Sequence, residues 1–208
     1  MRNAMIKLCS PDNVPVILAS ASPRRVALLA QMGLVPDQIM PADIDEADRK
    51  GELPVPYAKR MAQEKTKLIA DKYPDAFVIG ADTVVACGRR ILPKAEERHV
   101  AEECMGLLMG RAHRVYGGIA LYNPRLQKIV VKSSVSHVSM RRLDGQEMRD
   151  YLAHGDWDGK AGGYAIQGAA AEFITKIQGS YSQIMGLDIY LMAKLCKAAG
   201  FVKDKGEA

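Results

Sequence analysis

The segment Ser20-Ala-Ser-Pro-Arg-Arg25 lies between two stretches with different hydrophobic patterns. The apolar run Val14-Pro-Val-Ile-Leu-Ala19 precedes it and predicts a strand, while Val26-Ala-Leu-Leu-Ala-Gln-Met32 follows it with the spacing of an amphipathic helix. Ser22 is a favourable N-cap, and Pro23 suits the first helical position. The sequence therefore predicts a strand, a tight turn and a helix.

This predicted turn also carries groups that bind anions. The start of a helix presents unpaired N–H groups and the positive end of the helix dipole. Ser20 and Ser22 add hydroxyl groups, and Arg24 and Arg25 add guanidinium groups whose donors match phosphate oxygens. Two interpretations fit the segment alone: a phosphate site, or a capped surface helix with two solvated arginines.

The composition is that of a globular protein and favours an anionic ligand. The chain has 208 residues, of which 48% are hydrophobic and 25% are charged, with a net charge of +5. We expect a single domain over residues 1–208, with flexible ends at 1–13 and 202–208. Only 6% of the residues are aromatic and the basic doublets are scattered, so nucleic acid is not an expected partner.

Cysteine, histidine and hydropathy patterns narrow the class of protein further. The four cysteines lie far apart without a C-x-x-C pair, which favours reduced thiols. The four histidines lack the spacing of a zinc site. No apolar run reaches the roughly 18 residues of a membrane span, and the first residues lack a signal-peptide core. We therefore expect a cytoplasmic protein without membrane contact.

Patterns further along the chain alternate between helices and strands. A short strand begins at Gln38. The next elements predicted are a helix over Tyr57–Asp71, a strand over Phe77–Val85, a helix over Glu96–Met109, strands over Val115–Tyr122 and Ile129–Met140, a helix capped by Asp144 with Glu147, a strand over Phe173–Ile177 and a helix over Leu187–Ala199. This alternation predicts an α/β fold with helices packed on a mixed sheet.

Several charged residues interrupt or follow these apolar patterns. Asp82 interrupts the strand over 77–85, where a carboxylate is paired, metal-bound, catalytic or tied to a turn. Lys65 falls on the apolar stripe of its helix, so it extends either to the helix edge or into an anionic site, and we favour the second. Asp43, Asp45 and Glu46 form an acidic loop that suits a divalent cation, although as an isolated feature it is better explained as solvated.

Taken together, these stretches resemble the Maf family of nucleoside triphosphate pyrophosphatases. The matching segments follow the order of the family and cover about residues 14–200. They are Leu18-Ala-Ser-Ala-Ser-Pro-Arg-Arg25, Asp43-Ile-Asp-Glu46, Glu64-Lys65, Gly80-Ala-Asp-Thr-Val84, Ile91-Leu-Pro-Lys94, Lys160-Ala-Gly-Gly-Tyr-Ala-Ile-Gln-Gly168 and Ile177-Gln-Gly-Ser-Tyr181. Each segment alone is a weak signal, but the ordered set is specific.

The resemblance implies a mixed, curved sheet flanked by helices, with two lobes around a cleft, as in inosine triphosphatase-like proteins. It also implies hydrolysis of a nucleoside triphosphate between the α and β phosphates, with Mg²⁺ or Mn²⁺ as the divalent cofactor. The implied site residues are Asp82 as catalytic base, Arg25, Thr83 and Gln167 for substrate choice, Ser20, Arg24, Lys65 and Lys94 for phosphate binding, and Asp45, Glu46 and Asp82 for the metal.

At the substrate-choice positions the chain resembles the family branch that prefers dTTP and UTP, and it lacks the residues of the sister branch that acts on 7-methyl-GTP. The chain also departs from the usual family pattern. Ala95 follows Lys94, Asp188 replaces a usual proline, and Gly117-Gly118 replaces a pair that usually contains threonine. These departures bear on loop conformation and efficiency more than on the chemistry.

Two other classes of function fit parts of the sequence. A non-catalytic regulator of septum formation would have no need of Asp82 in a core strand with Lys65 and Lys94 around it. A nucleic-acid-binding module built on the basic doublets predicts steep salt dependence and no turnover. The sequence is also compatible with a homodimer.

Overall fold

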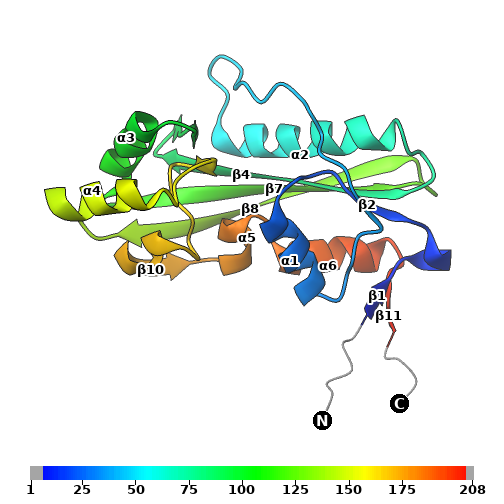
Figure 1. Ribbon diagram of the computed structural model, residues 1–208. Coiled ribbons are helices and arrows are strands. Elements are labelled where there is room, and N and C mark those ends of the chain that lie inside the picture. Colours follow the sequence, from blue (N-terminus) through cyan, green and yellow to red (C-terminus); the bar gives the residue numbers. More distant parts are fainter. Residues whose placement is uncertain (1–6, 205–208) are drawn as a thin grey trace, which may run out of the picture.

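The computed structural model describes residues 7–204 as a mixed α/β fold around one large sheet (Figure 1). The strand order is β10-β8-β7-β4-β2-β3, and β5 also pairs with β4. β2 runs parallel to β3 and β4, whereas the other pairs of this sheet are antiparallel. The strands are β1 Lys7–Cys9, β2 Val16–Leu18, β3 Gln38–Ile39, β4 Phe77–Cys87, β5 Arg90–Ile91, β6 Lys94–Ala95, β7 Ala112–Asn123, β8 Lys128–Met140, β9 Lys160–Ala161, β10 Ile174–Gln178 and β11 Val202–Asp204. The predicted α/β fold with a mixed sheet is confirmed.

Helices cover both faces of this sheet. The longest helix, α2, lies along one face, while α1, α5 and α6 lie on the other, and α3 and α4 lie toward the far end of the long strands (Figure 1). The helices are α1 Pro23–Gln31, α2 Pro54–Ala70, α3 Arg98–Leu108, α4 Gly145–His154, α5 Tyr181–Met185 and α6 Ile189–Ala198, with 3-10 turns at Pro11–Asn13 and Ala169–Phe173. The predicted capping box of Asp144 and Glu147 is present at the start of α4.

The last predicted helix is preceded by a helix that the sequence analysis did not predict. The final helix, α6, begins at Ile189, and the short α5 ends at Gly186, whose φ of 141° is outside the helical range. Asp188 caps α6, because its carboxylate accepts a hydrogen bond from Leu191 N at 3.1 Å. The departure from the family pattern at Asp188 therefore supplies an N-cap.

The two ends of the described chain pair with each other. β1 and β11 form an antiparallel two-stranded sheet, with Leu8 opposite Lys203. Leu8 is buried, and its N–H donates to Gly33 O at 2.8 Å. These contacts order parts of the segments 1–13 and 202–208 that we expected to be flexible. Residues 1–6 and 205–208 lie outside the described part.

Two hydrophobic cores lie on the same face of the long strands and define two lobes. Phe77, Ile79 and Ala81 of β4 belong to the first core, which packs against α1 and α6. Val85 of β4 belongs to the second core, which contains side chains of α3 and α4. Thr83 lies between Ala81 and Val85 and points to the same face, because side chains alternate along a strand. β4 therefore runs through both lobes, and Thr83 lies between the residues that the strand contributes to the two cores.

The helix α2 packs very close to the opposite face of the sheet. A Cβ atom on Gly118 of β7 would lie 1.9 Å from Ala58 O, and one on Gly80 of β4 would lie 2.1 Å from Thr66 Oγ1. Only glycine allows the helix backbone to approach these strands so closely. The close packing of α2 therefore explains why position 118 carries a glycine.

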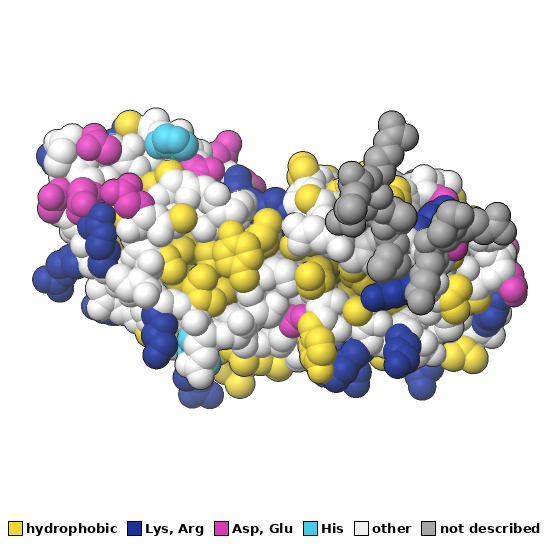
Figure 2. Space-filling view, turned by 90° about the horizontal axis from the view of Figure 1, so that it is seen from below, with side chains coloured by type: hydrophobic (Ala, Val, Ile, Leu, Met, Phe, Trp, Pro, Cys, Tyr) yellow, Lys and Arg dark blue, Asp and Glu magenta, His cyan; other side chains and the backbone are white. Residues whose placement is uncertain are grey.

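The surface on the α1, α5 and α6 side is mixed in character. Hydrophobic side chains gather near the middle of this face, and lysine and arginine side chains lie scattered around them (Figure 2). Within residues 7–204, no helix has the length and apolar character needed to cross a bilayer.

The close approach of α2 gives a first prediction. Gly118→Ala should destabilise the protein by about 3 kcal/mol or more, because the added methyl group would overlap the backbone of α2. Gly106→Ala is the matched control. Position 106 is an exposed interior residue of α3 with nothing within 4 Å of the added atom, so this change should stabilise by about 0.5–1 kcal/mol. Urea unfolding of both variants measures the difference, and equal stabilities would contradict the packing argument.

Candidate active site

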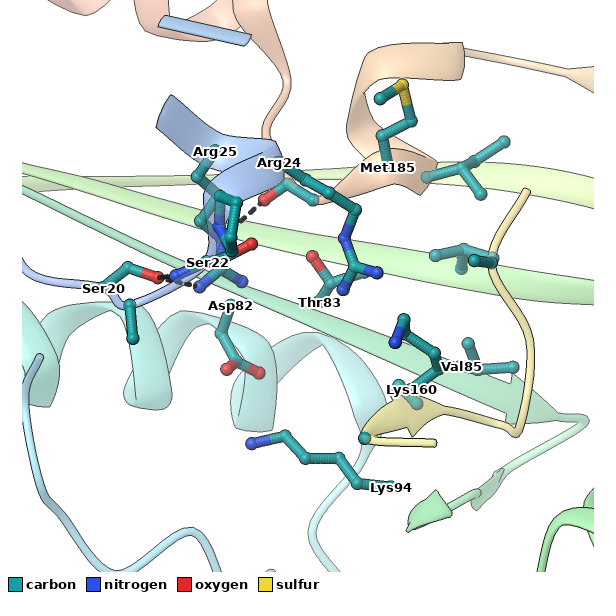
Figure 3. A pocket seen from close by; sticks show the side chains of 18 of the residues that line it. Ser20, Ser22, Arg24, Arg25, Asp82, Thr83, Val85, Lys94, Lys160 and Met185 are labelled. Carbon is teal, nitrogen blue, oxygen red and sulfur yellow. Dashed lines mark hydrogen bonds between the residues drawn. The ribbon is translucent and has the colours of Figure 1, made fainter. Parts of the chain in front are cut away.

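A cleft of about 630 Å³ opens at the edge of β4 that faces β2. β2 pairs with β4 as far as Ile79, and β5 pairs with it again from Ala86. Among the described residues, no strand covers the edge between these two points. The start of α1, the acidic loop, the glycine-rich segment 159–167 and the end of α5 surround the opening (Figure 3). The volume is in the range of small-molecule sites.

One half of the cleft is a cluster of carboxylate and ammonium groups. Lys65 Nζ lies 2.7 Å from Asp82 Oδ1 and 2.6 Å from Glu46 Oε1. Lys94 Nζ contacts Oε2 of the same glutamate. Lys65 and Asp82 are each only 6% exposed, so their opposite charges offset the cost of burial. Lys65 therefore extends from α2 into the cleft rather than to solvent at the helix edge.

Glu46 is held in its ionised form. Burial would raise the pKa of its carboxyl group, but the hydrogen bonds from Lys65 and Lys94 outweigh this effect and lower the pKa to about 2. The loop that carries Glu46 is fixed to α2, because Tyr57 Oη donates a hydrogen bond to Glu46 O at 2.7 Å. The position of this carboxylate therefore depends on α2, as does that of Lys65.

The two arginines at the start of α1 have different environments. Arg25 donates from Nη1 to Ser20 Oγ at 2.8 Å and from Nε to Gly186 O at 3.0 Å, so it joins the start of α1 to the end of α5. Arg24 extends into the cleft, and its Nε has no hydrogen-bond partner among the described residues (Figure 3). Burial lowers the pKa of both guanidinium groups, although the high ordinary value for arginine keeps them charged at neutral pH.

Ser22 occupies the predicted N-cap position but makes no capping hydrogen bond. Its N–H instead donates to Ser20 Oγ at 3.2 Å. The predicted cap is therefore right in position and wrong in its bonding. Both serines line the cleft at the N-terminal end of α1, where a helix favours an anion.

The other half of the cleft lies on the Thr83 face of the sheet and is mainly apolar. Val85, Val115 and Met185 form its walls. Tyr164, from the glycine-rich segment, adds an aromatic ring. Thr83 Oγ1 is buried here without a hydrogen-bond partner among the described residues. This half suits a largely uncharged group that offers a few hydrogen bonds.

The structure brings nearly all the predicted site residues into this one cleft. Those that line it are Ser20, Arg24, Arg25, Glu46, Lys65, Asp82, Thr83, Lys94 and Gln167. Asp45 does not line it, because its side chain turns back into an exposed loop and accepts a hydrogen bond from Ala47 N at 2.9 Å. Of the three residues expected to hold a metal, the cleft therefore contains two.

Several other residues that line the cleft had no site role predicted from the sequence. Lys160 extends into the cleft (Figure 3), and its strand β9 pairs with β6, which carries Lys94. A lysine within a glycine-rich stretch could have indicated that Lys160 lies in the cleft. Val85 and Val115 gave no signal, because lining residues of this type have the same pattern as core residues.

The donor set fits a divalent cation that is also bound by its substrate. Within residues 7–204, no group of three or more histidine, cysteine or acidic residues is arranged to hold a metal ion. Glu46 and Asp82 nevertheless offer hard carboxylate oxygens at one point of a cation-lined cleft. Mg²⁺ is commonly held by one or two carboxylates together with substrate phosphates. These two residues therefore suit a metal that arrives with a phosphorylated ligand.

The fold and the cleft together define an α/β protein with a site for an anionic small molecule. The comparison of sequences gives the family. Residues 15–199 match the Maf family, described as Maf-like protein, and the chain belongs to this family.

Several relatives cover almost the whole chain. A protein named dTTP/UTP pyrophosphatase from Paramagnetospirillum magneticum is 53% identical over 188 residues, which are 89% of this chain and 97% of that protein. Proteins of the same name from Rhodospirillum rubrum and Zymomonas mobilis are 51% and 49% identical, covering 90% and 89% of this chain and 89% and 92% of their own lengths. Among solved structures, the Ham1 protein of Staphylococcus aureus has a TM-score of 0.40 and 13% identity, over 61% of this chain and 71% of that one.

A buried histidine supports the aromatic wall of the cleft. His113 of β7 is 2% exposed, and its Nε2 lies 2.7 Å from Tyr164 Oη. The two rings meet edge to face with centroids 5.4 Å apart. Burial lowers the pKa of His113 to about 4 and raises that of Tyr164, so both side chains are neutral at neutral pH.

The lowered pKa of His113 predicts a pH-dependent stability. Between its folded pKa of about 4 and its ordinary value of 6.5, the unfolded chain binds more protons than the folded chain. His113 therefore contributes stability, on the order of 3 kcal/mol, that is complete above pH 6.5 and is lost as the pH falls toward 4. His113→Phe should flatten the fall of melting temperature with pH in this window. Tyr164→Phe, which keeps the histidine, should retain it, and identical pH profiles for all three proteins would contradict the assignment.

Proposed function

We propose that this protein is a nucleoside triphosphate pyrophosphatase that hydrolyses the α–β anhydride of dTTP and UTP, releasing the monophosphate and pyrophosphate. The observation that carries the proposal is the position of Asp82 and Thr83 as consecutive residues at the uncovered edge of β4. Their side chains point to opposite faces of the sheet, so a charged half and an apolar half meet in one cleft. The relatives named dTTP/UTP pyrophosphatase, at 49–53% identity, support the same substrates.

The charged half has the chemistry that a triphosphate requires. Such a ligand carries about four negative charges, and its cleavage depends mainly on positioning and on electrostatic stabilisation. Arg24, Lys94 and Lys160 supply cationic groups around the opening, and the N-terminal end of α1 adds its dipole. The nucleoside would then extend over the Thr83 face, where the walls are apolar.

Asp82 is the proposed general base. Its Oδ1 accepts the hydrogen bond from Lys65, and no described residue donates a hydrogen bond to Oδ2. In the proposed step, Oδ2 takes a proton from the attacking water as the new P–O bond forms and the bond to the bridging oxygen breaks. Lys65 holds the carboxylate in place, and nearby cations offset the charge left on the departing phosphate oxygen.

The divalent cation, Mg²⁺ or Mn²⁺, would be held by Glu46 and Asp82 together with phosphate oxygens of the substrate. When bound there, it supplies positive charge that offsets the charge of the triphosphate. Lys65 and Lys94 contact both oxygens of Glu46, and Lys65 also contacts Oδ1 of Asp82, so a bound cation would replace part of these contacts.

The proposed choice of a pyrimidine rests on three residues with separate tasks. Gln167 is exposed at the rim, and its amide offers both a donor and an acceptor to the O4 and N3 edge of uracil or thymine. Thr83 offers a hydroxyl group from the floor of the apolar half. Arg25 acts indirectly, because it fixes Ser20 and the end of α5 at Gly186.

The role of Asp82 can be tested by one substitution. Asp82→Asn should lower kcat by roughly 10²-fold or more, because the amide cannot accept the proton from water, and it should also lower the melting temperature, because Lys65 loses a buried charged partner. The control is Asp71→Asn, which changes an exposed carboxylate paired with Lys67 on α2 and should leave kcat unchanged. Steady-state pyrophosphate release with Mg²⁺ or Mn²⁺ gives the comparison, and near wild-type turnover by Asp82→Asn would assign Asp82 to structure alone.

A nucleotide panel tests the proposed function itself. We expect kcat/KM for dTTP and UTP to be well above that for ATP, GTP and 7-methyl-GTP. A site that hydrogen-bonds a pyrimidine leaves some of its polar groups unpaired when another base is bound, and each unpaired group costs roughly 1–3 kcal/mol. Gln167→Glu should lower the pyrimidine rates, since the acid lacks the amide donor for O4. Gln63→Glu, on the exposed face of α2, is the matched control.

The outcomes of this panel separate two claims. Equal rates for all five nucleotides, or a lead for 7-methyl-GTP, would overturn the pyrimidine preference. Absence of pyrophosphate release from every nucleotide would overturn the proposed activity.

A further inference from the structure

Gln183 is a buried polar side chain to which the mechanism above gives no role. It lies on α5 and is 0% exposed, and neither its Nε2 nor its Oε1 has a hydrogen-bond partner among residues 7–204. Burying an unpaired amide is costly, and native structures pair nearly all such groups. We therefore expect a polar partner of this amide in the neighbouring cleft.

The Gln183 amide lies against Gly117 of β7. A Cβ atom on Gly117 would lie 2.8 Å from Gln183 Cγ and 3.1 Å from Gln183 Nε2. A side chain at position 117 would displace the amide, so the glycine provides the space that Gln183 occupies. The next residues along α5 and its end, Ile184, Met185 and Gly186, all line the cleft.

Thr83 is the residue directly opposite Gly117 in the ladder of β4 and β7. On the other edge of β4, Ile79 O and Val85 O accept hydrogen bonds. Because backbone groups alternate between the two edges, Thr83 and Gly117 form a non-hydrogen-bonded pair, in which the Cα atoms are only about 4.5 Å apart. Thr83 Oγ1 is also buried without a partner among the described residues. Two unpaired polar groups therefore lie over the same point of the sheet.

We propose that Gln183 is a positioning residue that orients the Thr83 hydroxyl toward the nucleobase, through a direct hydrogen bond or one buried water. This inference rests on the proposed function, because it assigns how the same cleft recognises its base. Nε2 is the nearer of the two polar atoms to Gly117. When Nε2 donates to Thr83 Oγ1, the hydroxyl proton remains free to point at the ligand.

The orientation of that proton selects the base. A hydroxyl that donates is complementary to the carbonyl O4 of uracil, which accepts. Cytosine carries an amino group at the same ring position, so it presents a donor where the hydroxyl also donates. A site built in this way should therefore favour UTP over CTP, and the part of this preference that adds to the contact of Gln167 should require both Gln183 and Thr83.

The test is a double-mutant cycle on the ratio of kcat/KM for UTP to that for CTP. Gln183→Met removes the amide at similar volume, and Thr83→Val removes the hydroxyl. We expect the wild type to favour UTP and each single change to lower the ratio by about tenfold. The double variant should lose no more than either single variant, because the two groups act through one hydroxyl orientation.

Controls separate this role from packing. Leu195→Val, a change on the buried face of α6, should lower the melting temperature without changing the ratio. If Gln183→Met does not fold, Gln183→Asn, whose amide is one methylene shorter, is measured in its place with the same expected loss. An unchanged ratio in the Gln183 variant, or additive losses in the double variant, would overturn the inference while leaving the pyrophosphatase activity in place. A wild type that hydrolyses neither UTP nor CTP would overturn this inference, and only a wild type that also fails on every nucleotide of the panel would overturn the proposed activity.

Discussion

The contact of Lys65 with Asp82 and Glu46 is the interaction on which the arrangement of the cleft depends. Removing one partner from a buried ion pair costs about 3–5 kcal/mol, so these charged groups hold their places together. They join α2, β4 and the acidic loop at one point. The ammonium group reaches this point because the backbone of α2 packs directly on Gly80 and Gly118. These two glycines, which have no side chain, therefore determine where the ammonium group of Lys65 lies in the cleft.

The alternation of side chains along β4 then separates two kinds of chemistry. Asp82 points toward α2 and the charged groups, and Thr83 points toward α5 and the apolar walls. The same strand continues into both hydrophobic cores, so the two halves are held in a fixed relation. Arg25 adds a second connection across the cleft, because it bonds to Gly186 at the end of α5. The site is thus built on one long strand, and shorter, separate segments form its sides.

The sequence predicted those parts of the site that break a local pattern. Asp82 within an apolar strand and Lys65 on an apolar stripe both lie in the cleft, and the alternation of elements gave the fold class. Features that depend on contacts between distant elements were not predicted. Helix α5 is too short for periodicity to appear, and Asp45 belongs to an acidic cluster whose members turn to different sides. The need for a glycine at position 118 was not predicted either, because only the packed helix shows that a side chain has no room there.

The uncovered edge of β4 has a consequence for how substrate preference can change. Ile79 O and Val85 O accept hydrogen bonds on this edge, so the backbone groups of Ala81 and Thr83, two and four residues along from Ile79, point the same way. Main-chain N–H and C=O groups at the opening belong to every variant of the chain, whatever side chains it carries. Substitutions can therefore change substrate preference through side chains. They leave the main-chain donors and acceptors on the edge of β4 in place.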